Sequence, residues 1–493
     1  MTTPSAPVLS SDESTGASTT ALNGNNGGKN LNVNNDNKND AAANNETANR
    51  ARKTLFPLLG IYLLGALCLQ AFNMVFAKIG SDLGAATNAS LITAIPGVVL
   101  AIVCFIYGSL GDFASLKTMT VFGIIALVFG SVGGFFMHES LILVIIFRII
   151  QTIGFQTAGS VYLVVVARYL TEREKLLYFG LFTADYQLAT AIGVVSAGVF
   201  SAIDWKFLFL IPVVAVVFLI PLIKYLPGKT GGKTHIDVPG FGLFGMAILF
   251  LTLFFSVLDW WMLAVSAAFL VLFAIYISKA TDPFVTPAFF KNVPWRESVL
   301  LIVIFYFINF AITPLCNDFG AALFGMSSTQ VSLMLLPGLI IATITGCFSG
   351  RIVSKLGKRW SITLGAGMMA AGFILGGLFL RLGPILIGFC AALIYAGMAT
   401  IYSPTANTVL GTLPPEQTGR GVGMNDLAMQ GSGAVGIALF GGPISAHAFG
   451  WNTVLGPEGA YASSATMLIL FGVIVAVGVL WLQLHHKKFY HEN

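Results

Sequence analysis

Residues 55–77 read LFPLLGIYLLGALCLQAFNMVFA, and this stretch holds no charged side chain. Its 23 residues exceed the roughly 20 that an α-helix needs to cross about 30 Å of hydrocarbon. A segment that spans lipid must pair its backbone groups internally, which an open strand cannot do. The stretch therefore predicts a transmembrane helix.

Runs of the same kind repeat as far as residue 484, with short polar breaks between them. They predict an all-α, polytopic membrane protein with about fourteen transmembrane helices. The predicted spans are 55–77, 91–110, 118–137, 141–166, 176–202, 206–226, 239–258, 261–278, 297–317, 330–350, 360–380, 384–404, 421–445 and 462–484.

The composition also indicates a surface that faces lipid. The 493 residues are 56% hydrophobic and 10% charged, whereas soluble domains carry about 25% charged residues. The net charge of +5 comes from basic residues scattered singly between apolar runs, so nucleic acid is not an expected partner. The five cysteines lie in apolar runs without paired spacing, which predicts neither disulfides nor structural zinc.

Lysine and arginine are distributed unevenly among the connections, and this predicts the orientation of the chain. If the N-terminus is cytoplasmic, the opposite side holds only Lys78, Lys206 and Arg381, and the remaining connections carry the other basic residues. Both termini are therefore expected in the cytoplasm, with the chain in the cell membrane as a monomer.

Two short basic turns suggest a duplicated six-helix unit. GSLGDFASLKT at 108–118 follows the second predicted helix and GRIVSKLGKR at 350–359 follows the tenth, and each is entered through glycine. The tail rich in Asn, Ser and Gly cannot offset the entropy cost of ordering. The predicted units are a disordered cytoplasmic tail (1–50), an N-terminal six-helix bundle (51–226), an inserted helix pair (239–278), a C-terminal six-helix bundle (297–484) and a cytoplasmic tail (485–493).

Several motifs resemble those of the major facilitator superfamily. The first basic turn resembles the GxLxDRxGRR signature, with Gly108, Leu110, Asp112 and Lys117 in the matching places. RIIQTIG at 148–154 resembles the superfamily's RxxQGxG segment. These two motifs and three further segments make the sequence similar to the fourteen-helix drug:proton antiporters, particularly the tetracycline and multidrug exporters of Gram-positive bacteria. These segments are VVVARYLTERE (164–174), TDPFVTPAFFKN (281–292) and GVGMNDLAMQGSGAVGIALFGG (421–442).

The resemblance implies two six-helix bundles with an inserted helix pair, and an inner gate built from the two basic turns. The Asp112 carboxylate is expected to cap the N-terminal end of a neighbouring helix, where the helix dipole favours negative charge. The gate residues implied in this way are Gly108, Asp112, Lys117, Gly350, Gly357, Lys358 and Arg359.

Ionisable side chains at membrane depth are candidates for proton coupling, because each costs several kcal/mol there. Arg148 lies about seven residues into its predicted helix and Asp185 about nine residues into the next one. Since the two helices are consecutive and antiparallel, Arg148 and Asp185 are expected within pairing distance. In one interpretation, Asp185 binds and releases a proton while the charge of Arg148 shifts the pKa of the Asp185 carboxyl group. In the other, the two residues form a static ion pair.

Two further aspartates are candidates for lesser roles. Asp426 lies roughly one and a half turns into its helix, and it is expected either to snorkel to the cytoplasmic face or to act as a second proton site. Asp318, with Asn317, closes the ninth predicted helix and is expected to be a solvated end or a gate contact.

Polar side chains at membrane depth are the candidates for a substrate cavity, because each needs a partner there. They either line a wet central path or form hydrogen bonds between helices. The candidates are Gln70, Asn73, Gln151, Gln156, Tyr186, Gln187, Asn309 and Tyr402, with aromatic walls from Phe155, Phe305 and Tyr306.

The motifs of the common nucleotide- and ester-cleaving enzymes are missing, since the chain has neither GxxxxGK[ST] nor GxSxG. No enzyme activity, cofactor or metal site is expected, and the energy for transport must come from an ion gradient or from the substrate's own gradient. The sequence predicts proton-coupled efflux of a small amphipathic compound by alternating access. Two alternatives remain open, a facilitator or proton symporter for a small nutrient, and a non-transporting membrane receptor or lipid-moving protein.

Overall fold

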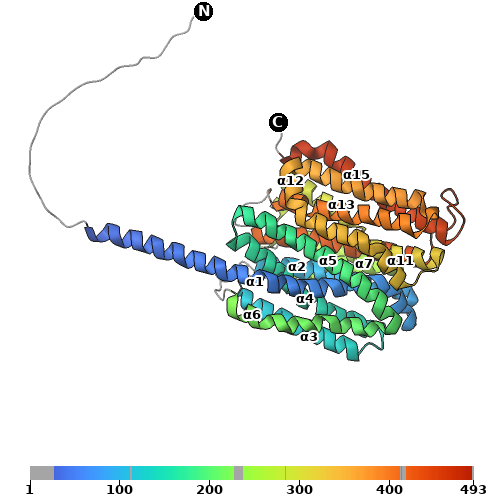
Figure 1. Ribbon diagram of the computed structural model, residues 1–493, viewed down its shortest axis with the longest axis horizontal. Coiled ribbons are helices and arrows are strands. Elements are labelled where there is room, and N and C mark those ends of the chain that lie inside the picture. The colour runs from blue at the N-terminus through green and yellow to red at the C-terminus, as the bar shows by residue number, and fades with distance from the viewer. Residues whose placement is uncertain are drawn as a thin grey trace, which may run out of the picture. The chain divides into compact units, whose positions relative to one another are not determined.

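Helices account for all the regular secondary structure in the part of the chain that the computed structural model describes. This part comprises residues 27–110, 114–226, 237–281, 283, 285–410, 412 and 418–490. Thirteen of the described helical segments are long and apolar enough to cross a membrane. Within residues 48–493, which cluster as one unit, these helices lie side by side with roughly aligned axes (Figure 1).

The described elements are α-helices, two single turns of 3₁₀-helix and one longer 3₁₀-helix, η2. The main elements are α1 (Gly27–Asp82), α2 (Leu91–Leu110), α3 (Leu116–Phe136), α4 (Leu141–Tyr169), α5 (Glu172–Ile203), η2 (Trp205–Phe218), α6 (Leu219–Tyr225), α7 (Val238–Val257), α8 (Trp260–Lys279), α9 (Pro287–Lys291), α10 (Val293–Tyr306), α11 (Asn309–Phe324), α12 (Ser328–Leu378), α13 (Pro384–Leu410), α14 (Thr418–Ser445) and α15 (Ala460–Tyr490). We call α1 to α6 the N-terminal half and α10 to α15 the C-terminal half.

Helix α12 contains two crossings. Its 51 residues would measure roughly 76 Å as one straight helix, more than twice the hydrocarbon thickness. Gly357 interrupts it with φ 74° and ψ 167°, a conformation that glycine adopts without the steric penalty of a Cβ. Counting α12 twice gives fourteen crossings, as the apolar runs predicted.

Basic side chains define two faces of the bundle. The basic face carries the α2–α3, α4–α5 and α8–α10 connections, and the opposite face carries Lys78, Lys206 and Arg381. The assignment of the basic face to the cytoplasm stays a prediction.

The start of α5 on the basic face is fixed by the ARYLTERE segment. Thr171 caps the helix in a capping box with Glu174, whose carboxylate accepts the Thr171 N–H at 3.0 Å. Arg52 of α1 donates to both carboxylate oxygens, at 3.1 and 3.2 Å. The hydrogen bonds from the Thr171 backbone and from Arg52 lower the pKa of Glu174 to about 2, so this link between α1 and α5 is ionised at neutral pH.

Three elements differ from the sequence expectations. Residues 27–47 are helical, although disorder was expected through residue 50, and residues 1–26 lie outside the described part. The expected α-helix over 206–226 is instead a 14-residue 3₁₀-helix followed by the short α6. Because a 3₁₀-helix rises about 2.0 Å per residue, these 14 residues alone cover roughly 28 Å.

The expected single helix over 297–317 is broken into α10 and α11. The break falls at Phe307 and Ile308, between Tyr306 and Asn309. Helix α14 approaches it closely, because a Cβ added at Gly436 would overlap the carbonyl oxygen of Phe307. The sequence contains Pro314 inside α11, but the break lies upstream of it.

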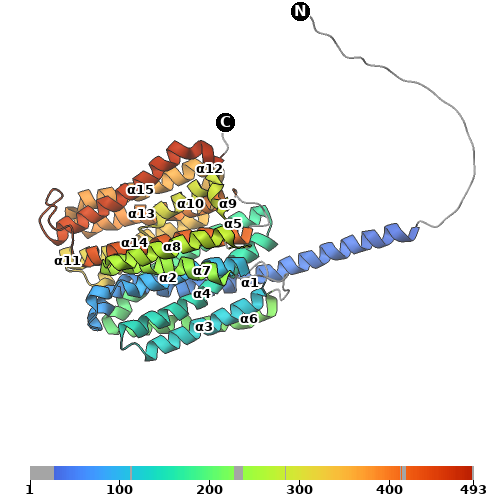
Figure 2. The ribbon, with the colours of Figure 1, turned by 180° about the vertical axis from the view of Figure 1, so that it is seen from behind.

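Helices α7 and α8 form the inserted pair between the two halves. The Ser266 hydroxyl of α8 donates to the Ala247 carbonyl of α7 at 2.8 Å, and the Tyr276 hydroxyl of α8 donates to Asp237, which caps α7. Helix α7 packs against α2 and α14, and α8 lies outside it (Figure 2).

Two seams join the halves, one between α5 and α12 and the other between α2 and α14. Glycine permits the close approach at both. A Cβ at Gly198 of α5 would lie 2.7 Å from the Thr329 Cα of α12, and a Cβ at Gly97 of α2 would lie 2.9 Å from the Ala434 Cβ of α14. Small residues at helix contacts are the usual means of tight packing in lipid, where no hydrophobic effect draws helices together.

The break at Phe307 gives a first prediction. Gly436→Ala should lower stability by about 1–3 kcal/mol, since the added methyl group overlaps the Phe307 carbonyl and forces α14 away. Gly442→Ala on the same helix meets nothing within 4 Å, and is expected to raise stability by up to about 1 kcal/mol through helix propensity. Thermal unfolding midpoints of the two purified full-length variants test this; equal midpoints would contradict the described contact.

Candidate functional site

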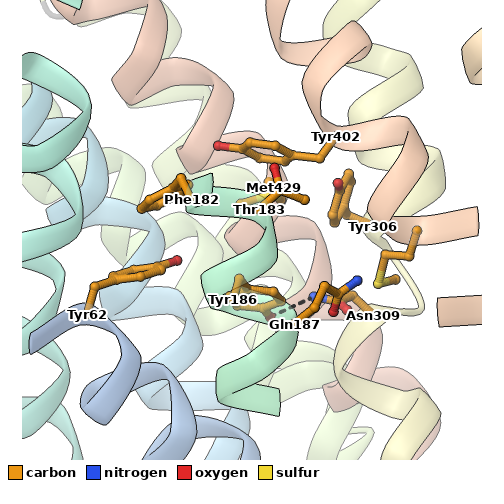
Figure 3. Close-up of a pocket in the computed structure, with 10 residues that line it drawn as sticks. Tyr62, Phe182, Thr183, Tyr186, Gln187, Tyr306, Asn309, Tyr402 and Met429 are labelled. Atoms are coloured by element: carbon orange, nitrogen blue, oxygen red, sulfur yellow. Dashed lines mark hydrogen bonds between the residues drawn. The ribbon is translucent and has the colours of Figure 1, made fainter. Parts of the chain in front are cut away.

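A small cavity lies between the two halves, near the middle of the bundle (Figure 3). Five of its residues come from the N-terminal half and five from the C-terminal half. They are Tyr62, Phe182, Thr183, Tyr186 and Gln187, and Tyr306, Asn309, Met398, Tyr402 and Met429. We call this the central cavity. Its volume of about 30 Å³ holds two or three waters, at roughly 10–15 Å³ each, and no drug-sized molecule.

Helical spacing brings these side chains together. On α5, Phe182 and Tyr186 are four residues apart and so lie on one face, and Met398 and Tyr402 repeat this spacing on α13. Tyr306 is the last residue of α10 and Asn309 the first of α11, so the helix break itself faces the cavity (Figure 3). No periodic pattern in the sequence indicated that break.

Aromatic rings form a continuous column from one half to the other. Tyr62 stacks on Phe182 with centroids 4.5 Å apart, and Phe182 stacks on Tyr162 at 5.5 Å. The Phe182 ring also approaches Tyr402 of the other half, at 6.3 Å. Such offset and tilted ring contacts are worth about 0.5–1.5 kcal/mol each beyond the area they bury.

A hydrogen-bond network centred on Tyr186 also links the halves. The Tyr186 hydroxyl accepts from Gln70 of α1 at 2.8 Å. It also accepts from Asn309 of α11 at 3.4 Å (Figure 3). Behind it, Asn73 donates to Gln70 at 3.2 Å. Gln187 donates to the Tyr395 carbonyl of α13 at 3.4 Å. Four of the predicted cavity residues thus line the cavity, and Gln70 and Asn73 support it.

Two predicted cavity residues lie elsewhere. Gln151 is buried inside the N-terminal half, where it donates to Ser131 of α3 at 2.8 Å and accepts from Arg148. Gln156 donates to Ser160, one turn along its own helix, at 3.2 Å. Neither residue lines the central cavity. Gln151 and Gln156 were predicted as cavity residues from their depth in the membrane alone. Depth does not indicate which face of a helix a residue occupies.

The expected pairing of Arg148 with Asp185 is wrong. Arg148 is 1% exposed, lies over the Phe72 ring at 4.4 Å and donates to Gln151 and Cys68, and no ion pair joins it to Asp185 in the described part. About 21 residues separate Arg148 from the end of α4, but only about 13 separate Asp185 from the start of α5. The two residues therefore differ in depth by roughly 12 Å at 1.5 Å per residue.

Both candidate proton sites carry buried oxygen atoms without a hydrogen-bond partner. One oxygen of Asp185 has none, and the same holds for one oxygen of Asp426. Asp426 is 3% exposed, so the expectation that it snorkels is wrong. Asp426 lies three residues before Met429 on α14, so the two side chains share a face of that helix, and Met429 lines the central cavity. Asp426 therefore lies beside that cavity. Helix α14 begins at Thr418, so Asp426 lies about 12 Å along it.

Sequence reasoning missed two buried acids, Asp237, which caps α7, and Glu297. Glu297 of α10 is 5% exposed, accepts from Arg296 at 3.0 Å through one oxygen and leaves the other without a partner. The predicted span began at this residue, which placed it at the membrane boundary. Helix α10 begins four residues earlier, at Val293.

The predicted gate residues are only partly described. Asp112 lies outside the described residues, so its capping role stays a prediction. Gly357 supplies the bend in α12, and Arg359 donates to Gln483 of α15 within the same half. Lys117 is the second residue of α3 on the basic face, and the roles of Gly108, Gly350 and Lys358 stay predictions.

Contacts between the halves close the cavity toward the opposite face. Thr329 of α12 donates to the Gly198 carbonyl of α5 at 2.8 Å, and Ser332 donates to the Val194 carbonyl at 2.6 Å. Asn317 donates to the Met74 carbonyl of α1 at 3.3 Å, which is a further contact between the halves. The neighbouring Asp318 instead pairs with His447 at 3.0 Å within its own half.

Close packing also joins the halves at the level of the cavity and on its basic-face side. A Cβ at Gly346 of α12 would lie 3.1 Å from the Ala184 Cα of α5, at the level of the cavity. A Cβ at Gly423 of α14 would lie 2.9 Å from the Phe105 Cα of α2, nearer the basic face. The described contacts thus hold the two halves together on both sides of a cavity that has room for only a few waters.

A helical bundle in two halves, with a cavity between them, is the architecture of many secondary transporters. Residues 58–436 match the family described as the Major Facilitator Superfamily, and this range is more than half of the chain. The chain belongs to the major facilitator superfamily. Members of that family are transporters and not enzymes, and this member, which we call the facilitator, is a multi-pass membrane protein.

The chain is similar to several bacterial proteins whose names refer to drug transport or drug resistance. The multidrug transporter protein MdtP of Bacillus subtilis (strain 168) is 28% identical over 315 residues, which cover 60% of this facilitator and 57% of MdtP. Multidrug resistance protein 3 of the same organism is 25% identical over 333 residues, 64% of each chain. The quinolone resistance protein NorB of Staphylococcus aureus (strain JH9) is 23% identical over 289 residues, 55% of this chain and 62% of NorB. The matched part thus spans less than two thirds of each of these relatives.

Solved structures confirm the fold. The human organic anion transporter MFSD10 (TETRAN) superposes with a TM-score of 0.55 at 13% identity, covering 88% of this facilitator and 99% of that chain. A POT family transporter in complex with 5-aminolevulinic acid gives a TM-score of 0.62 at 15% identity, with 89% and 96% covered. The predicted all-α facilitator fold is therefore confirmed.

The closure toward the opposite face gives a second prediction. Thr329→Val keeps the side-chain shape but removes the hydrogen bond to Gly198, worth about 1 kcal/mol, so opening on this face should become roughly fivefold more frequent. Cys316, which is 4% exposed and lies next to Asn317, should then react faster with a maleimide. The rate is measured by mass spectrometry in a Cys347→Ser background, because Cys347 is exposed.

The matched control is Thr345→Val on the same helix, where the hydroxyl bonds only to the Ile341 carbonyl of its own helix at 2.8 Å. Its Cys316 rate should equal that of the parent. Equal rates in the Thr329 and Thr345 variants would show that the contact with Gly198 does not hold this face closed.

Proposed function

We propose that this facilitator exports small amphipathic, drug-like compounds in exchange for protons, by alternating access. The observation that carries the proposal is the central cavity, to which both halves contribute and beside which the buried carboxyl group of Asp426 lies. A compound bound there contacts both halves at once, so its binding can govern which set of contacts between them opens.

The cavity wall supports an amphipathic substrate. Tyr62, Phe182, Tyr306 and Tyr402 offer flat apolar faces, and methionine side chains such as Met429 adapt to varied shapes. Asn309, Gln187 and the Tyr186 hydroxyl offer a few polar contacts for orientation. The names of MdtP and of multidrug resistance protein 3 support the same class of compound.

The buried carboxyl oxygens support coupling to protons. An ionised carboxylate without a partner costs several kcal/mol at membrane depth, and a bound proton removes that charge. Asp185 and Asp426 each have such an oxygen in the conformation described here. In the proposed cycle, protons taken up from the outside occupy these groups while the substrate is away, and they leave to the cytoplasm before the next substrate binds.

Arg148 takes no direct part in this proposal, because it lies apart from Asp185 and packs inside the N-terminal half. We propose that it instead holds α1 and α4 together through Phe72, Cys68 and Gln151. We also propose that the protein is a monomer in the cell membrane with both termini in the cytoplasm, and the distribution of basic side chains supports this orientation.

The third prediction tests the coupling. In inverted vesicles with a pH-sensitive dye, addition of a quinolone or another amphipathic drug should release protons from the lumen through the wild-type protein. Asp426→Asn and Asp185→Asn should each abolish this release, because a neutral amide binds no proton in the pH range of the assay. Asp259→Asn is the matched control, since Asp259 is exposed between α7 and α8 and should leave the release unchanged.

Binding of the same drug to the purified variants, measured by fluorescence, should persist and show that they are folded. Proton release that survives in both the Asp185 and the Asp426 variants would remove these residues from the coupling path. Net uptake of substrate together with protons, in the direction opposite to export, would favour the symporter alternative instead.

A further inference from the structure

A second cavity lies at the side of the bundle, between the inserted pair and the two halves. Its volume is about 340 Å³, and its wall is almost entirely apolar. We call it the lateral groove. Helices α2, α7, α8, α10 and α14 all contribute to its wall, through residues that include Val98, Ile102, Phe244, Phe273, Val303 and Ala428.

Helix α14 separates the lateral groove from the central cavity. Leu427 and Ala428 face the groove, whereas Met429 faces the central cavity. The other wall of the groove is the inserted pair, which covers α2 and α14 from outside (Figure 2). The groove is therefore a site distinct from the one proposed for the substrate.

The depth and size of the groove indicate its occupant. Each of the six wall residues named above lies within about ten residues, or ~15 Å, of the basic-face end of its span. The groove thus occupies the half of the membrane on that side. An apolar cavity of roughly 150 Å³ stays dry and takes up benzene, so a groove of about 340 Å³ has room for a longer hydrocarbon segment.

Positive charge lies beside the end of the groove on the basic face. Phe290 and Trp295 line the groove, and the residues that follow them, Lys291 and Arg296, are exposed. Lys279, at the exposed end of α8, lies six residues beyond Phe273 of the groove wall. Each cation of this kind near a membrane surface contributes about 1 kcal/mol toward binding an anionic lipid headgroup.

We propose that the lateral groove is a lipid site. It takes one acyl chain of an anionic phospholipid from the leaflet on the basic face, with the phosphate held near Lys279 and Lys291. The acyl chain fills the apolar space between the inserted pair and α14. The inserted pair thereby has a role in lipid binding that the two six-helix halves alone do not provide.

The test uses Trp295, which is 5% exposed, as a reporter in the full-length protein reconstituted in nanodiscs. Phosphatidylglycerol with bromine on its acyl chain should quench the part of the emission that Trp295→Phe removes. Ala428→Phe fills the groove and should abolish this quenching, and Val303→Phe is a second filling variant in case the first fails to fold. Ala274→Phe makes the same change as the first on the exposed side of α8, and should leave the quenching intact.

The charge is tested with Lys279→Gln and Lys291→Gln, each expected to reduce the preference for brominated phosphatidylglycerol over brominated phosphatidylcholine roughly fivefold. Lys355→Gln, an exposed lysine at the other basic turn, is the control that should change nothing. The proposal is overturned if the filling variants are quenched like the wild type, or if the two lipids quench equally. It is also overturned if a transported drug relieves the quenching by brominated phosphatidylglycerol and unbrominated phosphatidylglycerol does not. None of these readouts depends on transport.

Discussion

Charge that is buried in the membrane interior without a partner is the constraint on which the rest of this structure depends. A carboxylate in hydrocarbon costs several kcal/mol, so it persists only where a proton, a counter-ion or water reaches it. Asp185 and Asp426 each keep an oxygen without a hydrogen bond, while the bundle around them is otherwise well packed. The bundle tolerates this cost beside a cavity that both halves share, and a proton is the smallest ligand that removes it.

The contacts between the halves suit a structure that must open. They combine close approaches at glycine with a few single hydrogen bonds from Thr329, Ser332 and Asn317. Flat helix surfaces of small residues separate without the loss of interlocked side chains, and each hydrogen bond contributes only about 1 kcal/mol. In the proposed alternating-access cycle, small differences in binding energy are then sufficient to shift the balance between the conformations that open on either face.

Much of the fold could be predicted from the sequence, because a span in lipid requires an uninterrupted apolar run and few charges. The runs gave the fourteen crossings, including the two that share α12. The break between Tyr306 and Asn309 could not be predicted in this way, since both sides of it are equally apolar. Nor could the 3₁₀ geometry after Asp204, because hydropathy does not distinguish helix types.

The candidate site was predicted only in part, because hydropathy indicates the depth of a residue in the membrane but not the direction of its side chain. Depth in the membrane follows from position in a run, and it correctly selected Tyr186, Gln187, Asn309 and Tyr402. The direction in which a side chain points, and the length of its helix beyond the apolar run, do not follow from hydropathy. For these reasons Gln151 and Gln156 were placed in the cavity, Arg148 was paired with Asp185, and Asp426 was expected at the surface.

The buried guanidinium of Arg148 has a consequence of its own. It lies about 10 Å from the opposite-face end of α4, and it is fixed to the N-terminal half by Phe72 and Gln151. Any tilt of that half moves a full positive charge through the electric field of an energised membrane, where a complete crossing is worth about 2.3 kcal/mol per 100 mV. Voltage therefore biases the conformational equilibrium of this transporter even at steps in which no proton or solute is bound.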